Sequence, residues 1–523
     1  MVKSGEKATV FSKLYEFVLK YGIYLFALAI VAINVSLIFD NVLWGDEAAT
    51  INFIRGTGYV GVYQRIYAFD CHPPFYYFYL KTWSLVLGEH VWVYHLASVV
   101  PFIATIVLSL TVIKKSFGAI PSAFLILFTG LSTTCTEYNQ EVRMYALCFT
   151  FMLGAAYFSY RIAHDYRLIK LWVGFVILGV LAAYTHYYGF MISGILLFMT
   201  ALIVFIRNKG KTWLYGVLSI VAYLVLYSPW LLSFIKQLGD VKLGFWIEEP
   251  DKLDVVLKLV FGGEHLNKIF FPFIITISII YLLMEFGIFT VTYKKEEGMA
   301  FIVSRPRKKV FTDESAAFLG FYLTAFSTFA FAYAASALFR PILINRYMYP
   351  LIPIVLFILM TSVKRIIAIS SKEKETDNAI ETEISAVKNP CGRLFVFAIV
   401  IVWVVSLVVG LKDFIYFRSV CKTQNLYTEK ILTMIGTPEE DTVFTVEGVS
   451  HLAWSVLPYY FPEARVVNGS PVNVDDAGEI WAFMGYELDE YMIEELEARG
   501  YETEVYWDMV FTKYNCTLYH FSK

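Results

Sequence analysis

The chain has 523 residues, of which 58% are hydrophobic, 18% are aromatic and only 17% are charged. Soluble domains are typically about 45–50% apolar and about 25% charged. This composition, with a mean hydropathy of +0.59, excludes an ordinary soluble protein and predicts a polytopic membrane protein. The net charge of −2 gives no reason to expect a nucleic-acid partner.

The predicted fold is mainly α, with about eleven membrane-spanning helices. The first begins near Tyr21, behind a charged segment that lacks a cleavable-signal pattern, so we expect it to be retained. The expected spans are 21–40, 91–113, 119–136, 144–160, 168–185, 188–206, 212–235, 269–291, 316–338, 348–363 and 394–411.

Lysine and arginine gather on alternate connections, and this bias predicts which face is cytoplasmic. It places the N-terminus inside and the C-terminus outside. The other, extracytoplasmic face then holds 41–90, 137–143, 186–187, 236–268, 339–347 and everything after 412. The distinctive polar residues below all lie in this second set, which predicts an external site built by the loops 41–90 and 236–268.

Two domains are expected: a transmembrane domain over 1–411 and a small extracytoplasmic α/β domain over 412–523. The charged segment 371–390 reads as a solvated linker. In the second domain the pattern predicts helices at 428–434 and 489–499 and strands at 441–447, 479–484 and 504–511. Cys421 and Cys516 could form a disulfide in an oxidising compartment.

Asp46 and Glu47 directly follow the first span, in the segment WGDEAAT. Acidic residues at a helix end are often simply solvated. Partial shielding at a membrane surface, however, can raise a carboxyl pKa and provide a general base. Asp46 is the candidate base, and Glu47 would orient it or bind the acceptor.

His72 precedes two prolines and a predicted aromatic helix, Phe75 to Leu87. It is either a helix-capping residue or, with Lys81, a ligand of an anionic head group. Asp70 is a second acid or a turn former.

Further candidates lie in later external segments. Glu141 and Arg143 would be a second carboxylate and a phosphate ligand, or a local ion pair. His186 is a satisfied interfacial histidine or a substrate contact. Arg346 either reaches lipid head groups or neutralises a departing phosphate. Glu264 and His265 are a weak candidate pair for a divalent metal.

Four segments, WGDEA (44–48), HPPFYYFYLK (72–81), QEVRMYAL (140–147) and NRYMYP (345–350), occur in that order. Together they resemble the C-type glycosyltransferase (GT-C) superfold, in particular the protein O-mannosyltransferase and lipid A aminoarabinose transferase group, over roughly residues 20–365.

The resemblance implies an inverting transfer of a sugar from an undecaprenyl- or dolichyl-phosphate donor on the non-cytoplasmic side. It implies that Asp46 is the catalytic carboxylate, with Glu141 near a second acidic site. It also implies that His72 and Arg346 contact the donor phosphate. Some relatives bind a divalent metal near these loops, so a metal cofactor is optional.

Two other functions fit the composition: a transporter or flippase for a lipid-linked sugar, and a non-catalytic membrane scaffold. Transporters usually place ionisable residues in mid-membrane, whereas the centres of these spans hold few charges. A scaffold leaves Asp46, Arg143 and Arg346 unexplained. A glycosyltransferase is therefore favoured, and its acceptor is a glycan, a lipid or a protein.

Overall fold

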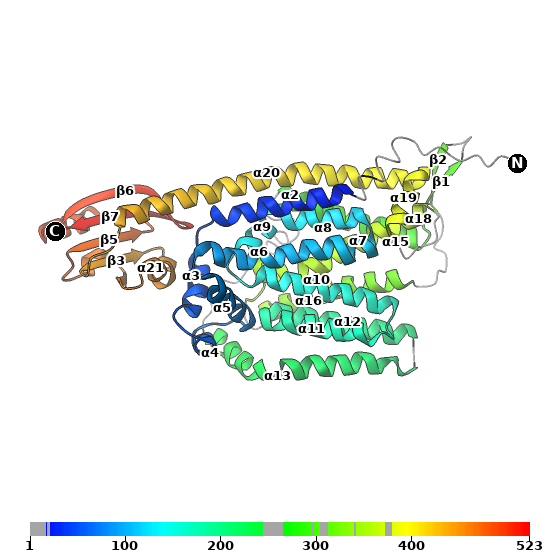
Figure 1. Ribbon diagram of the computed structural model, residues 1–523, viewed down its shortest axis with the longest axis horizontal. Helices are drawn as coiled ribbons and strands as arrows, with labels where there is room; N and C mark the ends of the chain where they lie inside the picture. The colour runs from blue at the N-terminus through cyan, green and yellow to red at the C-terminus, as the bar shows by residue number, and fades with distance from the viewer. Residues whose placement is uncertain are drawn as a thin grey trace.

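The computed structural model describes Phe17 and residues 21–208, 210–243, 265–294, 298–303, 312–338, 341–371 and 379–523, with 240–243 as backbone only. Within these residues the chain forms a helical bundle with a small sheet domain at one end (Figure 1). The expected mainly α membrane fold with a C-terminal α/β domain is confirmed.

Eight helical segments of the described chain are long and apolar enough to cross a membrane. They are α6 (Val91–Leu108) continued by η3 (Ser109–Ile113) and α7 (Lys114–Phe117), α10 (Tyr145–His164), α12 (Tyr187–Asn208), η4 (Gly210–Thr212) with α13 (Trp213–Leu243), α15 (His265–Glu285), α16 (Asp313–Leu338), α17 (Asn345–Met348) with η5 (Tyr349–Leu351) and α18 (Ile352–Ser371), and α20 (Pro390–Ile435).

Three further segments complete the correspondence with the eleven predicted spans. α8 (Ala119–Leu131) and α9 (Thr133–Gln140) form a pair bent by 65°. α2 (Ile23–Ser36) with η2 (Leu37–Phe39), and α11 (Ile169–Thr185), are shorter apolar helices. Each predicted span therefore falls on an observed helix, and the errors lie at the ends.

Those errors have local causes. α15 ends at Glu285, and a hairpin of β1 (Phe289–Lys294) and β2 (Gly298–Val303) follows where the span was extended to 291. α13 continues to Leu243, eight residues past its predicted end. The expected linker over 371–390 contains a helix, α19 (Ala379–Lys388), which packs on α18 and α20 and buries Glu383. The prediction of a solvated linker is wrong for that part.

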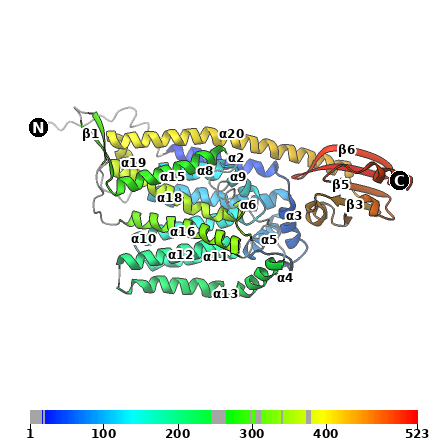
Figure 2. The ribbon, with the colours of Figure 1, turned by 180° about the vertical axis from the view of Figure 1, so that it is seen from behind.

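Three short helices follow α2 at the end of the bundle that faces the sheet domain: α3 (Gly45–Ile54), α4 (Tyr59–Phe69) and α5 (Phe75–Leu87) (Figure 1). The predicted helix over 75–87 is confirmed as α5. β1, β2 and α19 lie at the opposite end (Figure 2).

The C-terminal domain is a five-stranded mixed sheet in the order β4-β3-β5-β7-β6. Its strands are β3 (Thr442–Glu447), β4 (Arg465–Asn468), β5 (Glu479–Met484), β6 (Glu502–Phe511) and β7 (Tyr514–Ser522). The first three are parallel, while β7 and β6 are antiparallel to their neighbours. The short helices η6 (Leu452–Val456), α21 (Leu457–Tyr460), η7 (Pro471–Asn473) and α22 (Glu490–Ala498) complete the domain.

The strands predicted from the sequence are confirmed as β3, β5 and β6, and β4 and β7 were missed. Cys421 and Cys516 are buried free cysteines, so the structure holds no disulfide between them.

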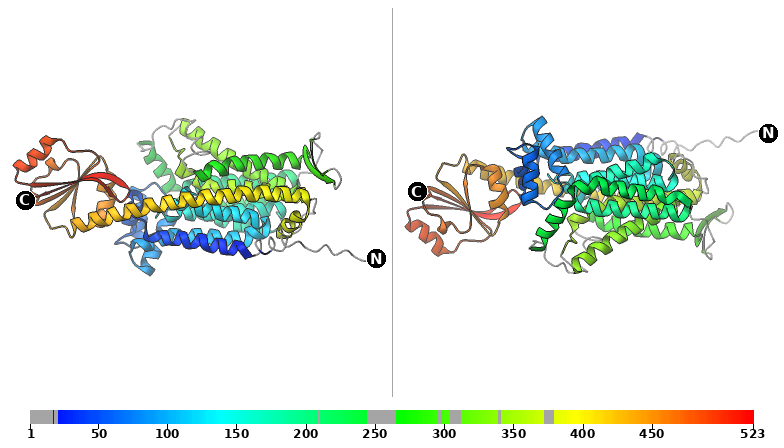
Figure 3. Two further views of the ribbon diagram at one scale, coloured as in Figure 1. Left: turned by 90° about the horizontal axis from the view of Figure 1, so that it is seen from above. Right: turned by 90° about the horizontal axis from the view of Figure 1, so that it is seen from below.

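One helix joins the two parts. α20 passes through residues 411 and 412 without a break and runs along the whole bundle into the sheet domain (Figure 3). The Arg418 guanidinium Nε donates to Asp40 Oδ2 at 2.8 Å, which ties α20 to the segment that precedes α3. The sheet domain therefore sits directly over α3.

Candidate active site

α3 begins where its own acidic residues cap it. The Glu47 carboxylate accepts the Trp44 backbone N–H through Oε2 at 3.0 Å, which satisfies a donor at the helix N-terminus. Its other oxygen, Oε1, accepts the Val142 N–H at 2.7 Å. Both carboxylate oxygens of Glu47 therefore accept backbone hydrogen bonds, and the residue is only 1% exposed.

A second glutamate, Glu141, also bonds to Trp44. The Trp44 indole N–H donates to Glu141 Oε1 at 3.0 Å. The latch, defined as Trp44, Glu47 and Glu141, thus fastens the start of α3 to the segment before α10. Since Asp46 precedes Glu47 and Arg143 follows Val142, the latch fixes these two side chains close together.

Asp46 faces a pair of arginines. Arg346 Nη1 donates to Asp46 Oδ2 at 2.8 Å, and Arg143 Nη2 lies 4.0 Å from the same oxygen. Burial alone would raise the pKa of Asp46, but Arg143 and Arg346 outweigh burial and hold this pKa below its usual value. The expectation of a raised pKa is therefore wrong for Asp46, because the cations stabilise its ionised form.

The raised carboxyl pKa belongs to Glu141 instead. Burial, and then the neighbouring Glu47 carboxylate, raise the pKa of Glu141 to about 8. Its Oε2 atom is buried and has no hydrogen-bond partner among the described residues. Glu141 contacts Trp44, and no hydrogen bond or ion pair among the described residues joins it to Asp46.

Arg143 links the loops. Its Nη1 donates to Thr50 Oγ1 at 2.9 Å, and its Nη2 lies 3.4 Å from His72 Nε2. The Nε atom is buried without a partner in the described part of the chain. An arginine held this way can still direct a donor toward a ligand.

His72 is held by an acid. His72 Nδ1 lies 2.9 Å from Asp70 Oδ1, while the Tyr77 hydroxyl donates to Asp70 Oδ2. Burial lowers the pKa of His72, but the acidic side chains of Cys71 and Asp70 raise it to about 9. The protonated ring turns an Nε2–H donor toward the same space as Arg143, an arrangement suited to an anion.

His186 and two tyrosines close this space. The His186 ring centroid lies 6.1 Å from that of His72, 5.7 Å from that of Tyr145 and 5.4 Å from that of Tyr347. Nδ1 of His186 accepts the Tyr188 N–H at 3.0 Å. His186 Nε2 and the Tyr145 hydroxyl are buried and unpartnered among the described residues. Burial, with His72 and Arg143 nearby, lowers the pKa of His186 well below its usual value, so the ring is neutral.

The sequence reasoning missed Tyr145 and Tyr347. Both follow an arginine within the quoted segments QEVRMYAL and NRYMYP. Their positions two residues after Arg143 and directly after Arg346 were the available signal. Without the fold, an aromatic residue at a membrane surface reads as an interface anchor.

Two predicted groups lie elsewhere. Lys81 is buried in α5, and no hydrogen bond or ion pair of the described chain joins its ammonium group to the site. Glu264 lies outside the described residues. His265 pairs with Asp413 at 2.9 Å and has a side chain that is 68% exposed.

Among the described residues, one group could hold a metal ion: Asp70, Cys71 and His72, whose ligand atoms lie within 4.8 Å of one another. The guanidinium of Arg143 beside His72 repels a cation there. The contacts therefore fit an anion better than a metal.

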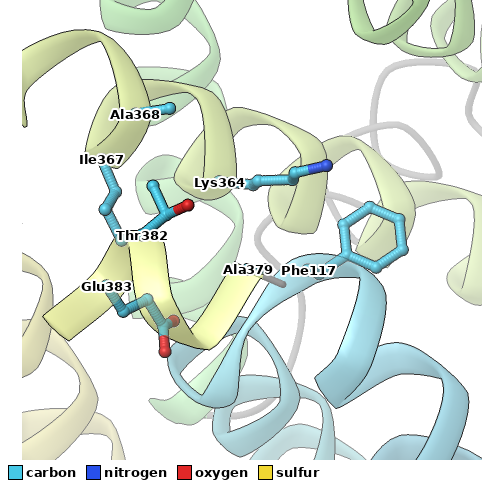
Figure 4. Close-up of a pocket in the computed structure, with 7 residues that line it drawn as sticks. All are labelled: Phe117, Lys364, Ile367, Ala368, Ala379, Thr382 and Glu383. Atoms are coloured by element: carbon cyan, nitrogen blue, oxygen red, sulfur yellow. The ribbon is translucent and has the colours of Figure 1, made fainter. Parts of the chain in front are cut away.

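A separate pocket lies at the far end of the bundle. Lys364, Thr382, Glu383 and four apolar residues line it (Figure 4). Glu383 accepts the N–H groups of Ala119 and Ile120 at 2.8 and 2.9 Å, so its charge caps α8. None of the predicted site residues lines this pocket.

No family model matches the chain, and no curated protein matches it. Two solved structures of ArnT from Cupriavidus metallidurans match at 14% identity, one in the apo state and one bound to undecaprenyl phosphate. The apo form has a TM-score of 0.58 over 95% of this chain and 98% of ArnT, and the bound form 0.57 over 95% and 97%.

The Archaeoglobus fulgidus oligosaccharyltransferase, tethered to an acceptor peptide, reaches a TM-score of only 0.39 at 12% identity, over 88% of this chain and 65% of its own. The similarity to ArnT extends over almost the whole of both chains. The chain therefore has the fold found in ArnT.

Proposed function

We propose that this protein is an integral-membrane glycosyltransferase. Its donor is a sugar linked to a polyprenyl phosphate, undecaprenyl or dolichyl, and its acceptor is a hydroxyl group on a glycan, lipid or protein. Transfer occurs with inversion on the face that carries the C-terminal domain, which we assign to the extracytoplasmic side.

The observation that carries this proposal is the cluster of donors around Asp46. Arg143, Arg346 and His72 bring three cationic side chains to one space. Arg143 Nε and the Tyr145 hydroxyl there lack partners in the described chain. Buried polar groups normally have hydrogen-bond partners, so the unpartnered ones indicate a ligand. Its chemistry is anionic, as a phosphate is.

The fold supports the same ligand class. ArnT, whose fold this chain shares, has been solved with undecaprenyl phosphate bound. A donor that lives in the membrane also explains why the cations lie at the end of a helical bundle.

The transfer step uses the two halves of the cluster. The acceptor oxygen attacks the anomeric carbon of the sugar and loses its proton to Asp46. The bond from that carbon to the phosphate oxygen breaks, and the electron pair leaves with the polyprenyl phosphate. Arg143, Arg346 and His72 stabilise this departing charge, where electrostatic stabilisation acts most strongly on the transition state.

Asp46 can serve as the base although its pKa is low. Arg346 donates a hydrogen bond to Asp46 Oδ2. A bound phosphate competes for the same guanidinium and so reduces its hold on the carboxylate. No hydrogen bond of the described residues involves Oδ1, which leaves that oxygen open to the acceptor proton.

The two alternative functions explain less. In a transporter we expect charged groups in the middle of the membrane along the translocation path. Here Glu285 and Glu314 lie at helix ends instead: Glu285 is the last residue of α15, and Glu314 is the second residue of α16. A scaffold has no need for cations packed around a half-buried carboxylate.

The test uses the full chain in proteoliposomes with radiolabelled undecaprenyl-phosphate sugars. We expect Asp46→Asn to lower turnover by about 10²–10⁴-fold, the usual effect of removing a general base. It should still bind undecaprenyl phosphate, because the cations remain. Asp313→Asn, which alters a half-buried pair with Arg207 at 2.6 Å at the other end of the bundle, is the control and should keep full turnover. Equal turnover in wild type and Asp46→Asn would exclude this base.

A further inference from the structure

The turn between β6 and β7 reaches from the C-terminal domain to the first residue of α3. The Gly45 backbone N–H donates to the Tyr514 hydroxyl oxygen at 3.1 Å. A Cβ atom at position 45 would lie 2.6 Å from that oxygen and 3.0 Å from His451 Cβ, so a larger residue there would have to displace the Tyr514 side chain. The turn is fixed from behind, because the Thr512 N–H donates to Thr428 Oγ1 of α20 at 2.8 Å.

This turn places the Lys513 ammonium group beside the latch. Lys513 Nζ lies 3.9 Å from Glu137 Oε1 and 5.7 Å from the Trp44 ring centroid. Lys513, Glu47 and Glu141 line one small pocket. The titratable groups around Lys513 are Glu47 of α3, His95 of α6, Glu137 of α9, Glu141, Cys421 of α20 and the adjacent Tyr514.

The latch needs a cation on this side. Glu47 and Glu141 are both nearly buried, at 1% and 5% exposure, and like charges at close range disfavour ionisation. Arg143 and Arg346 pair with Asp46, and Arg346 also lies 5.5 Å from the Trp44 ring centroid. Both glutamates line one pocket. Among the described residues that line it, Lys513 is the only lysine or arginine.

We propose that Lys513 is a positioning residue of the active site. Its charge holds the latch of Trp44, Glu47 and Glu141 closed, and the latch in turn holds Asp46 against Arg143 and Arg346. The C-terminal domain is then a working part of the catalytic centre. The effect on turnover rests on the proposed function, whereas the effect on the latch does not.

The pH dependence gives a specific signature. Glu141, with a pKa raised to about 8, is largely protonated at pH 6 and ionised at pH 8.5. Lys513 offsets the negative charge that appears as the pH rises through this range. Loss of Lys513 should therefore loosen the latch more at pH 8.5 than at pH 6.

The experiment measures hydrogen exchange of the full-length protein in lipid nanodiscs, each variant being compared with wild type at the same pH. In Lys513→Met, we expect the amides of residues 44–50 to exchange roughly tenfold faster at pH 8.5 and to change less at pH 6. Peptides from α11 and α12 should be unchanged. Lys513→Arg should restore protection.

Two further variants separate charge from general damage. Lys523→Met removes another lysine of the same domain, one that lies over the Tyr501 ring at 4.6 Å, and should behave as wild type. Glu141→Gln combined with Lys513→Met should abolish the extra loosening at pH 8.5. This double variant keeps the test open if Lys513→Met folds poorly.

Turnover supplies the second readout. We expect kcat of Lys513→Met to fall roughly tenfold, and to fall most on the alkaline side of its pH profile. The affinity for undecaprenyl phosphate should be retained. Wild-type exchange and a wild-type pH profile in Lys513→Met would overturn the proposal. If the wild-type protein transfers no sugar but Lys513→Met still exchanges faster, the proposed function would be wrong. The role of Lys513 in holding the latch would then still stand.

Discussion

The two ends of the helical bundle both bury charged side chains, but they satisfy them differently. At the end that carries α19, the Glu314 carboxylate accepts from His164 at 2.8 Å and from Lys364 at 3.1 Å. Glu285 accepts from Arg365 at 2.8 Å and from Ser315 at 3.1 Å. These carboxylates are matched by groups of the protein itself.

At the opposite end, the matching is incomplete. Arg143, Glu141, His186 and Tyr145 each keep a buried polar atom without a partner among the described residues. Leaving a buried polar group unsatisfied costs about 1–3 kcal/mol. The comparison shows that buried charge alone does not mark a site, and that the end around Asp46 differs in gathering several buried polar atoms without partners among the described residues.

The largest expected effect is structural and lies at the satisfied end. Glu314→Gln leaves His164 and Lys364 without their carboxylate, and breaking a buried ion pair typically costs about 3–5 kcal/mol. Thermal unfolding in detergent should show a markedly lower Tm, while turnover per folded molecule stays normal. A wild-type Tm would contradict the view of this network as structural.

The next effect belongs to the unsatisfied end. Arg143→Gln should lower affinity for undecaprenyl phosphate by about 10–100-fold, as expected for hydrogen bonds to a charged group worth about 1.5–3 kcal/mol. Its Tm should fall less than that of Glu314→Gln. Arg161→Gln, at the far end of α10, is the control and should bind normally.

His72→Gln should have a smaller effect that depends on pH. A histidine pKa of about 9 means that the ring is charged below pH 9 and loses its charge above it. Wild-type affinity for undecaprenyl phosphate should therefore decline above pH 9, measured by calorimetry. In the variant, affinity should be about 5–30-fold weaker at pH 7 and should lose this decline. A decline that persists unchanged would assign it to another group.

The smallest effect is expected for Tyr145→Phe. Its hydroxyl has no partner in the described structure, so its loss should leave the free energy of unfolding unchanged or higher. Affinity for undecaprenyl phosphate should fall only by about 2–10-fold. Tyr223→Phe should instead lower the free energy of unfolding and leave the affinity unchanged, since the Tyr223 hydroxyl bonds to Ser193 at 2.8 Å inside the bundle. If Tyr145→Phe destabilises the protein as Tyr223→Phe does, the comparison fails.

Much of the fold was predictable, because apolar runs of spanning length leave few alternatives. The bend between α8 and α9 and the helix α19 were not, since each depends on tertiary contacts such as the one from Glu383 to the start of α8.

Within the site, Asp46, Arg143, His72, His186 and Arg346 do gather around one space, as their placement on one face predicts. Their electrostatics could not be read from the sequence. The low pKa of Asp46 depends on an arginine 300 residues away, and the bond from Gly45 to Tyr514 spans 469 residues. Such contacts leave no local pattern.

The unbroken helix α20 has a mechanical consequence. Its 46 residues would extend about 69 Å at 1.5 Å per residue, more than twice the hydrocarbon core of a bilayer at about 30 Å. Because the helix is continuous, its length and its helical phase together fix both the height and the rotation of the sheet domain relative to the bundle. One residue inserted near position 425 would turn the sheet domain by about 100° and lift it by about 1.5 Å. The register of α20 thus sets how the sheet domain is aligned over α3 and the candidate site.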